Sequence, residues 1–344
     1  MRYPKFLKDG GTIGFIAPSF GCATEPYKTA FESALETFKQ AGYKTILGPN
    51  VYKSDGVGIS TDPVECAREV NIALTADSLD AVISCGGGEL MCEILPYVDF
   101  EAIKAAPAKL FQGYSDNTNL TFLLNTICDT AAIYGPCASE FGMKPWHKAI
   151  GDSYALLRGE KLLMDGYDNW EKDALKSEEN PLASYHVTEP TKYFPYNGKM
   201  PVQKMYAEGR LIGGCMDCLV NLVGTKYDRV KEFVNRYNDE GILWFLEACD
   251  LGVMDMRRAL WHMREAGWFE HASGFLIGRP MRFYDEAFGQ DHLSAVLGIL
   301  GEFGVPVIMD LDIGHLSPQI PILSGSYAHA MATDKTFSLE MELK

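Results

Sequence analysis

Strand-like and helix-like segments alternate through the first half of this chain of 344 residues, and this alternation restricts the fold more than any other feature. The strand-like segments are short apolar runs at 12–17, 44–47, 81–84, 109–111 and 131–134. Helix-like stretches such as 27–40 and 63–74 separate them. Strands that alternate with helices are typical of βαβ units. We therefore expect an α/β domain with a doubly wound parallel sheet.

Small or turn-forming residues follow these apolar runs. They read "APSFG" at 17–21, "CGGGE" at 85–89, "GYSD" at 113–116 and "GPCAS" at 135–139. The carboxyl ends of parallel strands lie at one edge of a sheet, and open α/β sheets bind ligands in a crevice at that edge. We therefore expect the four loops to converge on one crevice, in which the third loop displays Ser115.

The alternation stops at a polar stretch in which Pro181 and Pro190 break any long helix, and it resumes beyond that stretch. We interpret 159–204 as an insertion or linker between domains at 1–158 and 205–344. In the second half, apolar strand-like runs accompany helices predicted at about 254–266 and 292–303. The residues 320–342 resemble short antiparallel strands.

Composition and charge exclude several classes of partner. A net charge of −15 without a basic cluster disfavours nucleic acid. No apolar run approaches the roughly 20 residues that cross a bilayer, and the start of the chain lacks a signal-peptide pattern. The nine cysteines form no paired framework, so we expect them to be reduced in a cytoplasmic protein. A small molecule is the expected partner.

A serine at a strand end becomes a nucleophile when a neighbouring base removes its proton and a third group orients that base. Among the seven histidines, His315 alone follows a long apolar strand and a glycine, Gly314, that lets the backbone turn. Glu247 ends the apolar run 242–246, where a buried carboxylate is costly without a partner. We therefore predict that Ser115, His315 and Glu247 form a catalytic set. The backbone N–H groups of Gly87 and Asp116 are the expected oxyanion hole.

Structural roles are open for each residue taken alone. Ser115 can cap the helix that begins near 117, and Glu247 can pair with Arg257 or Arg258. The Cys215–Cys218 pair has no second pair and no histidine at metal spacing, so we expect no zinc site and no other metal. The glycine run at 86–88 lacks the spacing of nucleotide-binding motifs.

Six motifs in order along nearly the whole chain resemble the L,D-carboxypeptidase family of serine peptidases. They are "DGGTIGFIAPSFG", "GG" at 86–87, "GYSDNTNLTF", "GRLIGG", "ILWFLEACD" and "DIGH". The resemblance implies an N-terminal flavodoxin-like domain that carries the nucleophile, a C-terminal swivelling-type β/α domain, a homodimer, and a Ser-His-Glu triad without a cofactor. Motif by motif, the triad falls on Ser115, His315 and Glu247.

The sequence is more similar to the branch typified by the microcin C immunity peptidase than to the branch that trims murein tetrapeptides. We therefore predict hydrolysis of an amide bond in a small peptide or aminoacyl conjugate. The alternatives are a murein tetrapeptide carboxypeptidase and a ligand-binding module that has lost catalysis. Expected substrate contacts are Gly88, Glu89, Cys215, Leu251 and Trp170. Cys215 and Leu251 depart from the immunity branch, which favours a less charged leaving group than a nucleotide.

Overall fold

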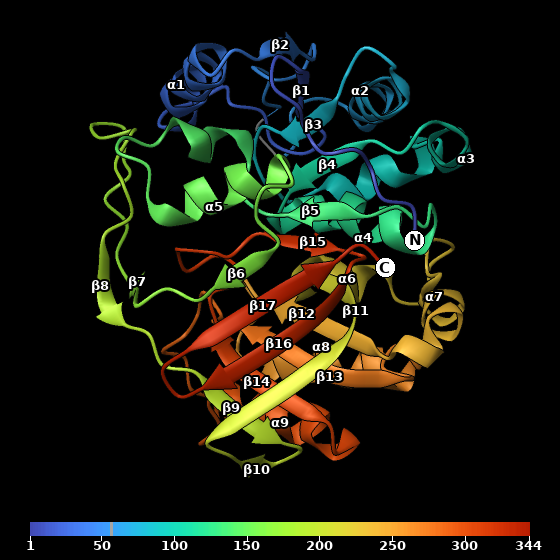
Figure 1. Ribbon diagram of the computed structural model, residues 1–344, viewed down its shortest axis with the longest axis vertical. Helices are drawn as coiled ribbons and strands as arrows, with labels where there is room; N and C mark the ends of the chain where they lie inside the picture. Colours follow the sequence, from blue (N-terminus) through green and yellow to red (C-terminus); the bar gives the residue numbers. More distant parts are fainter. Residues whose placement is uncertain (56–57) are drawn as a thin grey trace. The chain divides into compact units, whose positions relative to one another are not determined.

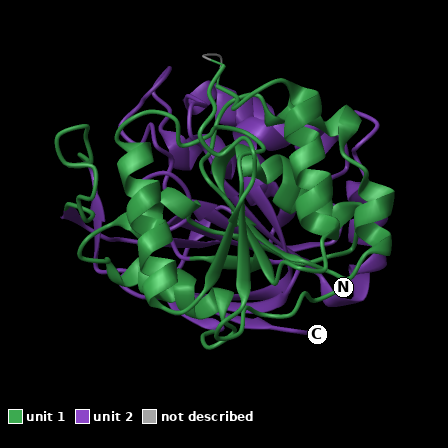
Figure 2. Cartoon of the chain, turned by 90° about the horizontal axis from the view of Figure 1, so that it is seen from above, with its two compact units in different colours: residues 1–161, 173–186, 321–323 green, residues 162–172, 187–320, 324–344 purple. Residues whose placement is uncertain are grey.

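The computed structural model describes residues 1–55 and 58–344 as two compact units. The first unit comprises 1–161, 173–186 and 321–323, and the second comprises 162–172, 187–320 and 324–344 (Figures 1 and 2). The segment 159–204 contributes residues to both units.

The first unit is built on a parallel sheet with the strand order β2-β1-β3-β4-β5, and β15 lies beyond β5. The strands are β1 (Thr12–Ile16), β2 (Lys44–Leu47), β3 (Ala81–Ser84), β4 (Leu110–Gly113), β5 (Ala132–Tyr134) and β15 (Ile322–Ser324). This is the flavodoxin-like order. The predicted parallel-sheet domain is confirmed. The strand β15 differs from expectation, because it joins this sheet and not the antiparallel tail.

Helices follow or connect these strands along the chain. They are α1 (Tyr27–Gln40), α2 (Pro63–Thr75), α3 (Phe100–Ala105), α4 (Thr118–Thr126) and α5 (Lys148–Leu157), with the short 3₁₀ helices η1 (Met91–Tyr97), η2 (Ser115–Asn117) and η3 (Ala138–Gly142). In α1, Phe31 and Phe38 are buried against Phe15 of β1, at ring distances of 5.5 and 5.7 Å. Burying one such ring contributes about 1.5–3 kcal/mol. The side chain of Asp62 caps α2, and Pro63 occupies its first turn.

The second unit is built on a nine-stranded mixed sheet with the order β10-β9-β14-β13-β12-β11-β16-β17-β6. Its central strands are parallel: β11 (Lys204–Cys215), β12 (Ile242–Glu247), β13 (Ala272–Gly278) and β14 (Pro306–Leu311). The flanking strands are antiparallel: β6 (Leu163–Asp165), β9 (Phe194–Asn197), β10 (Met200–Pro201), β16 (Tyr327–Thr333) and β17 (Phe337–Glu342). A separate ribbon consists of β7 (Asn169–Glu171) and β8 (Val187–Pro190).

The helices of the second unit pack on its parallel strands. They are α6 (Met216–Leu222), α7 (Val230–Arg236), α8 (Val253–Glu265) and α9 (His292–Leu300), with η4 (Asn238–Glu240) and η5 (Gly301–Phe303). Met256, Leu260 and Met263 are buried on one face of α8, in agreement with their helical spacing. Every residue of β12 is buried, so the strand reads as a continuous apolar run that ends in a carboxylate.

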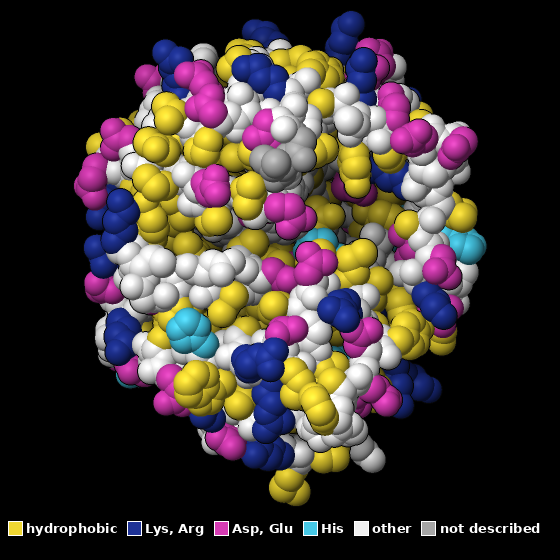
Figure 3. Space-filling model, turned by 180° about the vertical axis from the view of Figure 1, so that it is seen from behind, with side chains coloured by type: hydrophobic (Ala, Val, Ile, Leu, Met, Phe, Trp, Pro, Cys, Tyr) yellow, Lys and Arg dark blue, Asp and Glu magenta, His cyan; other side chains and the backbone are white. Residues whose placement is uncertain are grey.

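Charged side chains of both signs lie among one another on the face that Figure 3 shows. Lysine and arginine side chains on that face stand beside aspartate and glutamate, so it carries no continuous basic surface. Within 1–55 and 58–344, no helix has the length and apolar character needed to span a bilayer.

Candidate active site

Ser115 follows Tyr114, the first residue after β4, and has a left-handed backbone, at φ 63°. A residue other than glycine in this region costs on the order of 1–3 kcal/mol and persists only where its surroundings impose it. The cap positions of η2 and α4 are Tyr114 and Asn117, so Ser115 is not the helix cap that its sequence context allowed. The strand stops in a strained turn that leaves the serine half-buried.

The buried carboxylate of Asp116 holds this turn. It accepts hydrogen bonds from the Ser19 hydroxyl, from Met91 N at 2.8 Å and from Asn119 Nδ2 at 3.0 Å. Ser19 follows β1 and Met91 follows β3, so one side chain joins three loops at the carboxyl edge of the sheet. Sequence reasoning assigned Asp116 only a backbone N–H, and its side-chain role was missed.

The glycine loop after β3 lies against the serine. A Cβ atom added to Gly87 would be 3.1 Å from Ser115 Oγ, so this glycine leaves room beside the hydroxyl. Gly88 has φ 145° and approaches Ser19, where a side chain would overlap the hydroxyl. The side chain of Glu89 is exposed.

Glu247 and His315 form a pair in the second unit. Glu247 is the last residue of β12 and is fully buried, and its Oε2 lies 2.9 Å from His315 Nδ1. When the Nδ1–H group donates to the Glu247 carboxylate, Nε2 is the basic nitrogen of the imidazole. Burial disfavours the charged imidazole, but Glu247 and Cys249 outweigh it, so the pKa of His315 is raised well above its usual value.

Two glycines make this close approach possible. Gly314 has φ 108°, and a Cβ there would be 2.7 Å from Glu247 Oε2. A Cβ on Gly278 would be 3.0 Å from Glu247 Cβ and 2.1 Å from Ile313 O. Larger residues at either position would displace the glutamate from the imidazole.

The two arginines considered as partners of Glu247 have other contacts in the second unit. Arg258 pairs with Asp255, and Arg257 donates to Ser294 O at 3.4 Å. His292 is bonded to Asp310 at 2.8 Å. It therefore has a structural partner of its own.

A second carboxylate that the sequence did not reveal organises the turn after Glu247. Asp217, at the start of α6, accepts hydrogen bonds from Cys249 N at 3.0 Å, Asp250 N at 2.9 Å and Leu251 N at 3.1 Å. Three successive backbone N–H groups of this kind make an anion-binding concavity. In this chain an internal carboxylate occupies it.

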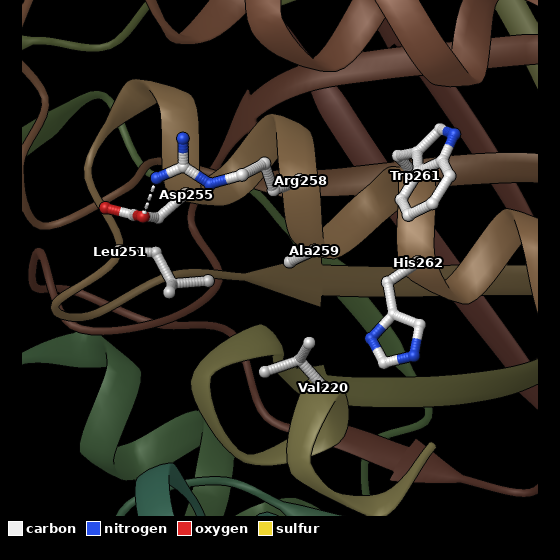
Figure 4. A pocket seen from close by; sticks show the side chains of 7 residues that line it. All are labelled: Val220, Leu251, Asp255, Arg258, Ala259, Trp261 and His262. Carbon is white, nitrogen blue, oxygen red and sulfur yellow. Dashed lines mark hydrogen bonds and ion pairs between the residues drawn. The ribbon is translucent and has the colours of Figure 1, made fainter. Parts of the chain in front are cut away.

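The predicted leaving-group residues flank this turn. Cys215 is buried and lies opposite Glu247 in the β11–β12 register. Its contact with Cys218 and its burial raise the pKa of the Cys215 thiol well above the ordinary value, so it is a neutral group. Leu251 lines a groove of about 460 Å³. The other lining residues are Val220, Asp255, Arg258, Ala259, Trp261 and His262 (Figure 4).

Trp170 lies on β7 and is 5% exposed. Its ring packs on Phe283 at 5.3 Å and lies under the Arg279 guanidinium at 5.0 Å. This predicted substrate contact is therefore occupied by protein neighbours. No three His, Cys, Asp or Glu side chains of the described ranges are grouped so that they could hold a metal ion.

Comparisons with known proteins cover both units. The model of the LD-carboxypeptidase N-terminal domain matches residues 13–135, and the model of its C-terminal domain matches 208–329. A Bacillus subtilis protein named a probable murein peptide carboxypeptidase is 26% identical over 98% of this chain and 94% of its own. The microcin self-immunity protein MccF of Escherichia coli is 24% identical over 93% of this chain and 90% of its own.

Solved structures agree with this assignment at the level of the fold. The structure of MccF in complex with glutamyl sulfamoyl guanosine superposes with a TM-score of 0.77 at 21% identity, and it covers 98% of each chain. Two domain models in the expected order therefore match a chain whose fold is that of MccF. This protein belongs to the LD-carboxypeptidase family and is a serine peptidase.

Proposed function

We propose that Ser115, His315 and Glu247 act together as a Ser-His-Glu triad that hydrolyses an amide bond. The observation that carries the proposal is the pair between buried Glu247 and His315, with 2.9 Å between Oε2 and Nδ1, because a hydrogen bond at Nδ1 makes Nε2 the basic nitrogen. The strained turn of Ser115 supports the nucleophile assignment.

The chemistry follows from these roles. As Ser115 Oγ attacks the carbonyl carbon, His315 Nε2 takes the hydroxyl proton, and Glu247 stabilises the imidazolium. The N–H groups of Gly87 and Asp116 are proposed to bind the oxyanion. When the C–N bond breaks, His315 gives its proton to the leaving amine. Water then attacks the acyl ester, His315 takes a proton from it, and Ser115 regains its hydrogen.

The proposed substrate is a small peptide or an aminoacyl conjugate. MccF has been solved with glutamyl sulfamoyl guanosine, which supports an aminoacyl conjugate as the general type. In this chain the turn after Glu247 binds the Asp217 carboxylate, and its side chain at 251 is a neutral leucine. A phosphate placed there would meet the Asp217 carboxylate, which already occupies the backbone N–H groups of the turn, and this repulsion is costly. We therefore propose a leaving group with less charge than a nucleotide.

Leu251→Lys tests this preference. We expect the wild type to have a higher kcat/KM for a neutral aminoacyl amide than for an aminoacyl sulfamoyl nucleoside. The lysine should raise kcat/KM for the charged nucleoside about 10- to 100-fold, because one charge-assisted contact contributes this much. Leu251→Met is the matched control. A wild type that strongly prefers the charged nucleoside, with no gain from the lysine, would overturn the proposal.

Two other functions are open to the same fold. A murein tetrapeptide carboxypeptidase is favoured by the Bacillus subtilis relative, and a binding module without catalysis is the second alternative. One purified sample assayed with murein tetrapeptide and with an aminoacyl conjugate separates all three. The reaction is proposed to be independent of metal, so EDTA should leave turnover unchanged, and a loss restored by zinc would refute the mechanism.

The setting of the enzyme is also a proposal. We propose a cytoplasmic homodimer with a nucleophile domain at 1–158, an inserted segment at 159–204, and a domain at 205–344 that carries Glu247 and His315. The nine cysteines, which form no disulfide, agree with a reducing compartment. Light scattering coupled to gel filtration measures the oligomeric state.

A further inference from the structure

His315 lies on a loop that is closed at its base by Asp312. The N–H of Ile320 donates to Asp312 O at 2.8 Å, and the N–H of Ile313 donates to Leu311 O at 2.8 Å. The segment 313–319 therefore leaves and rejoins the end of β14 at one point. The orientation of His315 depends on how firmly that point is held.

The side chain of Asp312 is fully buried and is the centre of a hydrogen-bond network. Its Oδ1 pairs with Arg279 Nη2 at 2.6 Å, and its Oδ2 accepts from Tyr193 Oη at 2.7 Å and from Tyr167 N at 2.9 Å. Tyr167 and Tyr193 belong to the predicted insertion. The insertion thus supplies two of the three donors that hold the base of the His315 loop.

Arg279 connects this network to Glu247. The arginine is 1% exposed, and besides Asp312 it contacts β14 through N to Leu311 O at 3.0 Å and through Nη2 to Asp310 O at 3.2 Å. It directly follows Gly278, the glycine that lies against both Glu247 Cβ and Ile313 O. A shift of Arg279 would therefore move the backbone that separates the glutamate from the histidine loop.

A buried ion pair of this kind is not explained by stability alone. Removing two charges from water is costly, and apolar replacements of buried ion pairs are often as stable. The pair does not lie between Glu247 and His315, whose own contact is direct. Its distinctive property is that it joins the ends of β13 and β14 with fixed geometry.

We propose that Asp312, through its ion pair with Arg279 and its hydrogen bond from Tyr193, is a positioning residue that keeps the His315 imidazole on Glu247. The inference rests on the proposed triad and deepens it. In this proposal Asp312 acts through the loop that carries the base, and its contacts are with Arg279, Tyr193 and Tyr167.

Two variants and a matched control test the proposal. Asp312→Asn should lower kcat about 10- to 100-fold with KM unchanged, because sub-ångström misplacement of a base costs this much. Tyr193→Phe removes one donor while Asp312 keeps its ion pair with Arg279, and it should lower kcat roughly 3- to 10-fold. Glu240→Gln is the control, since Glu240 pairs with buried Arg210 at 2.5 Å near the opposite end of β12. It should leave kcat unchanged.

A double-mutant cycle separates positioning from a general loss of stability. In a Glu247→Gln background the imidazole has lost its carboxylate, so Asp312→Asn should cost less than twofold further. The Nδ1 proton of His315, followed by NMR, should lose its strongly downfield signal in Asp312→Asn and keep it in Glu240→Gln. The inference would be overturned if the losses of Asp312→Asn and Glu247→Gln were additive. It would also be overturned if Tyr193→Phe had a normal kcat and an unchanged Nδ1 proton signal of His315.

The kinetics of these variants distinguish an error in the proposed triad from an error in the positioning role of Asp312. If Ser115→Ala and His315→Ala remain active, the proposed function is wrong. If both are inactive while Tyr193→Phe and Asp312→Asn behave like Glu240→Gln, only the positioning role is wrong. Should Asp312→Asn fail to fold, Tyr193→Phe alone decides the question.

Discussion

The turns that carry Ser115 and His315 both present a side chain at a strand end, but they differ in which residue has the positive φ. Each follows a buried parallel strand and displays one polar side chain at a strand end. In the first, the serine itself has the unfavourable φ of 63°; in the second, Gly314 takes φ 108° in front of the histidine. The nucleophile turn therefore carries strain in the functional residue, whereas the histidine turn places it in a glycine, where it costs little.

The carboxylates that hold the two turns differ correspondingly. Asp116 accepts hydrogen bonds from a hydroxyl, a backbone N–H and an amide, all of them neutral donors. Asp312 adds a buried arginine to its donors. A network of neutral donors can fix a short turn that leads straight into a helix. A longer loop that must place an imidazole to within fractions of an ångström has an ion pair at its base.

Removing either displayed side chain should have the largest effect. Ser115→Ala and His315→Ala should each lower kcat on the order of 10⁴-fold, and the double variant should be no slower than the worse single one, because the groups act as a unit. Steady-state kinetics on an amide substrate measures this. Near-full activity in Ser115→Ala, or losses that multiply in the double variant, would show that the two residues do not act as one catalytic unit.

Gly314→Ala should break the histidine turn specifically. The added Cβ would meet Glu247 Oε2 at 2.7 Å in a backbone that alanine rarely adopts, so we expect kcat to fall about 100-fold. Gly304→Ala is the matched control, because Gly304 has φ 68° and no atom within 4 Å of an added Cβ. It should lower stability by about 1 kcal/mol and leave kcat intact. An equal fall of kcat in both variants would show that Gly314 has no specific role in the histidine turn.

Asp116→Ala should release the nucleophile turn. Three donors lose their buried acceptor, so we expect the free energy of unfolding to fall by about 3 kcal/mol, with reduced reactivity of Ser115. Asp62→Ala, which removes the exposed N-cap of α2, should cost about 1 kcal/mol without changing the serine. Urea unfolding and labelling rates check both. A stable Asp116→Ala variant with a normal labelling rate at Ser115 would show that the turn does not depend on the Asp116 carboxylate.

The pH profile reports on the histidine turn alone. The Glu247 carboxylate favours the protonated imidazole and raises the pKa of His315, so kcat/KM should rise with pH along a limb centred above the usual 6.5. In Glu247→Gln burial remains and lowers the pKa, so the limb should move to lower pH while the maximum rate falls. The stability that the pair contributes is complete below the unfolded-state pKa and is lost as pH rises through the folded-state pKa. A limb that stays in place would contradict the pairing.

Local patterns in the sequence were sufficient for most strands of the first sheet and for selecting the residues of the proposed triad. Apolar runs gave the strands of the first sheet, helical spacing gave the buried face of α8, and strand ends pointed to Ser115, Glu247 and His315. The carboxylates that hold these residues were not predictable. Asp116 bonds Ser19 across 97 positions and Asp312 bonds Arg279 across 33, and such partners depend on which strands become neighbours.

The same limit applies to β15 and to the φ of Ser115. The run at 322–324 has the same apolar character as the tail strands, yet it lies in the other sheet, because pairing is decided by tertiary contacts. A positive φ at a serine has no composition signal, since the usual marker of that backbone is glycine.

Covalent labelling of Ser115 tests most directly whether the two turns form one catalytic unit. The wild type is incubated with a fluorophosphonate probe, and the modified residue and rate are read by intact mass and peptide mapping. We predict a single label on Ser115, formed at least about 100-fold more slowly in His315→Ala, because an isolated serine hydroxyl is a poor nucleophile. Absence of label on Ser115, or equal labelling rates with and without His315, would contradict the account.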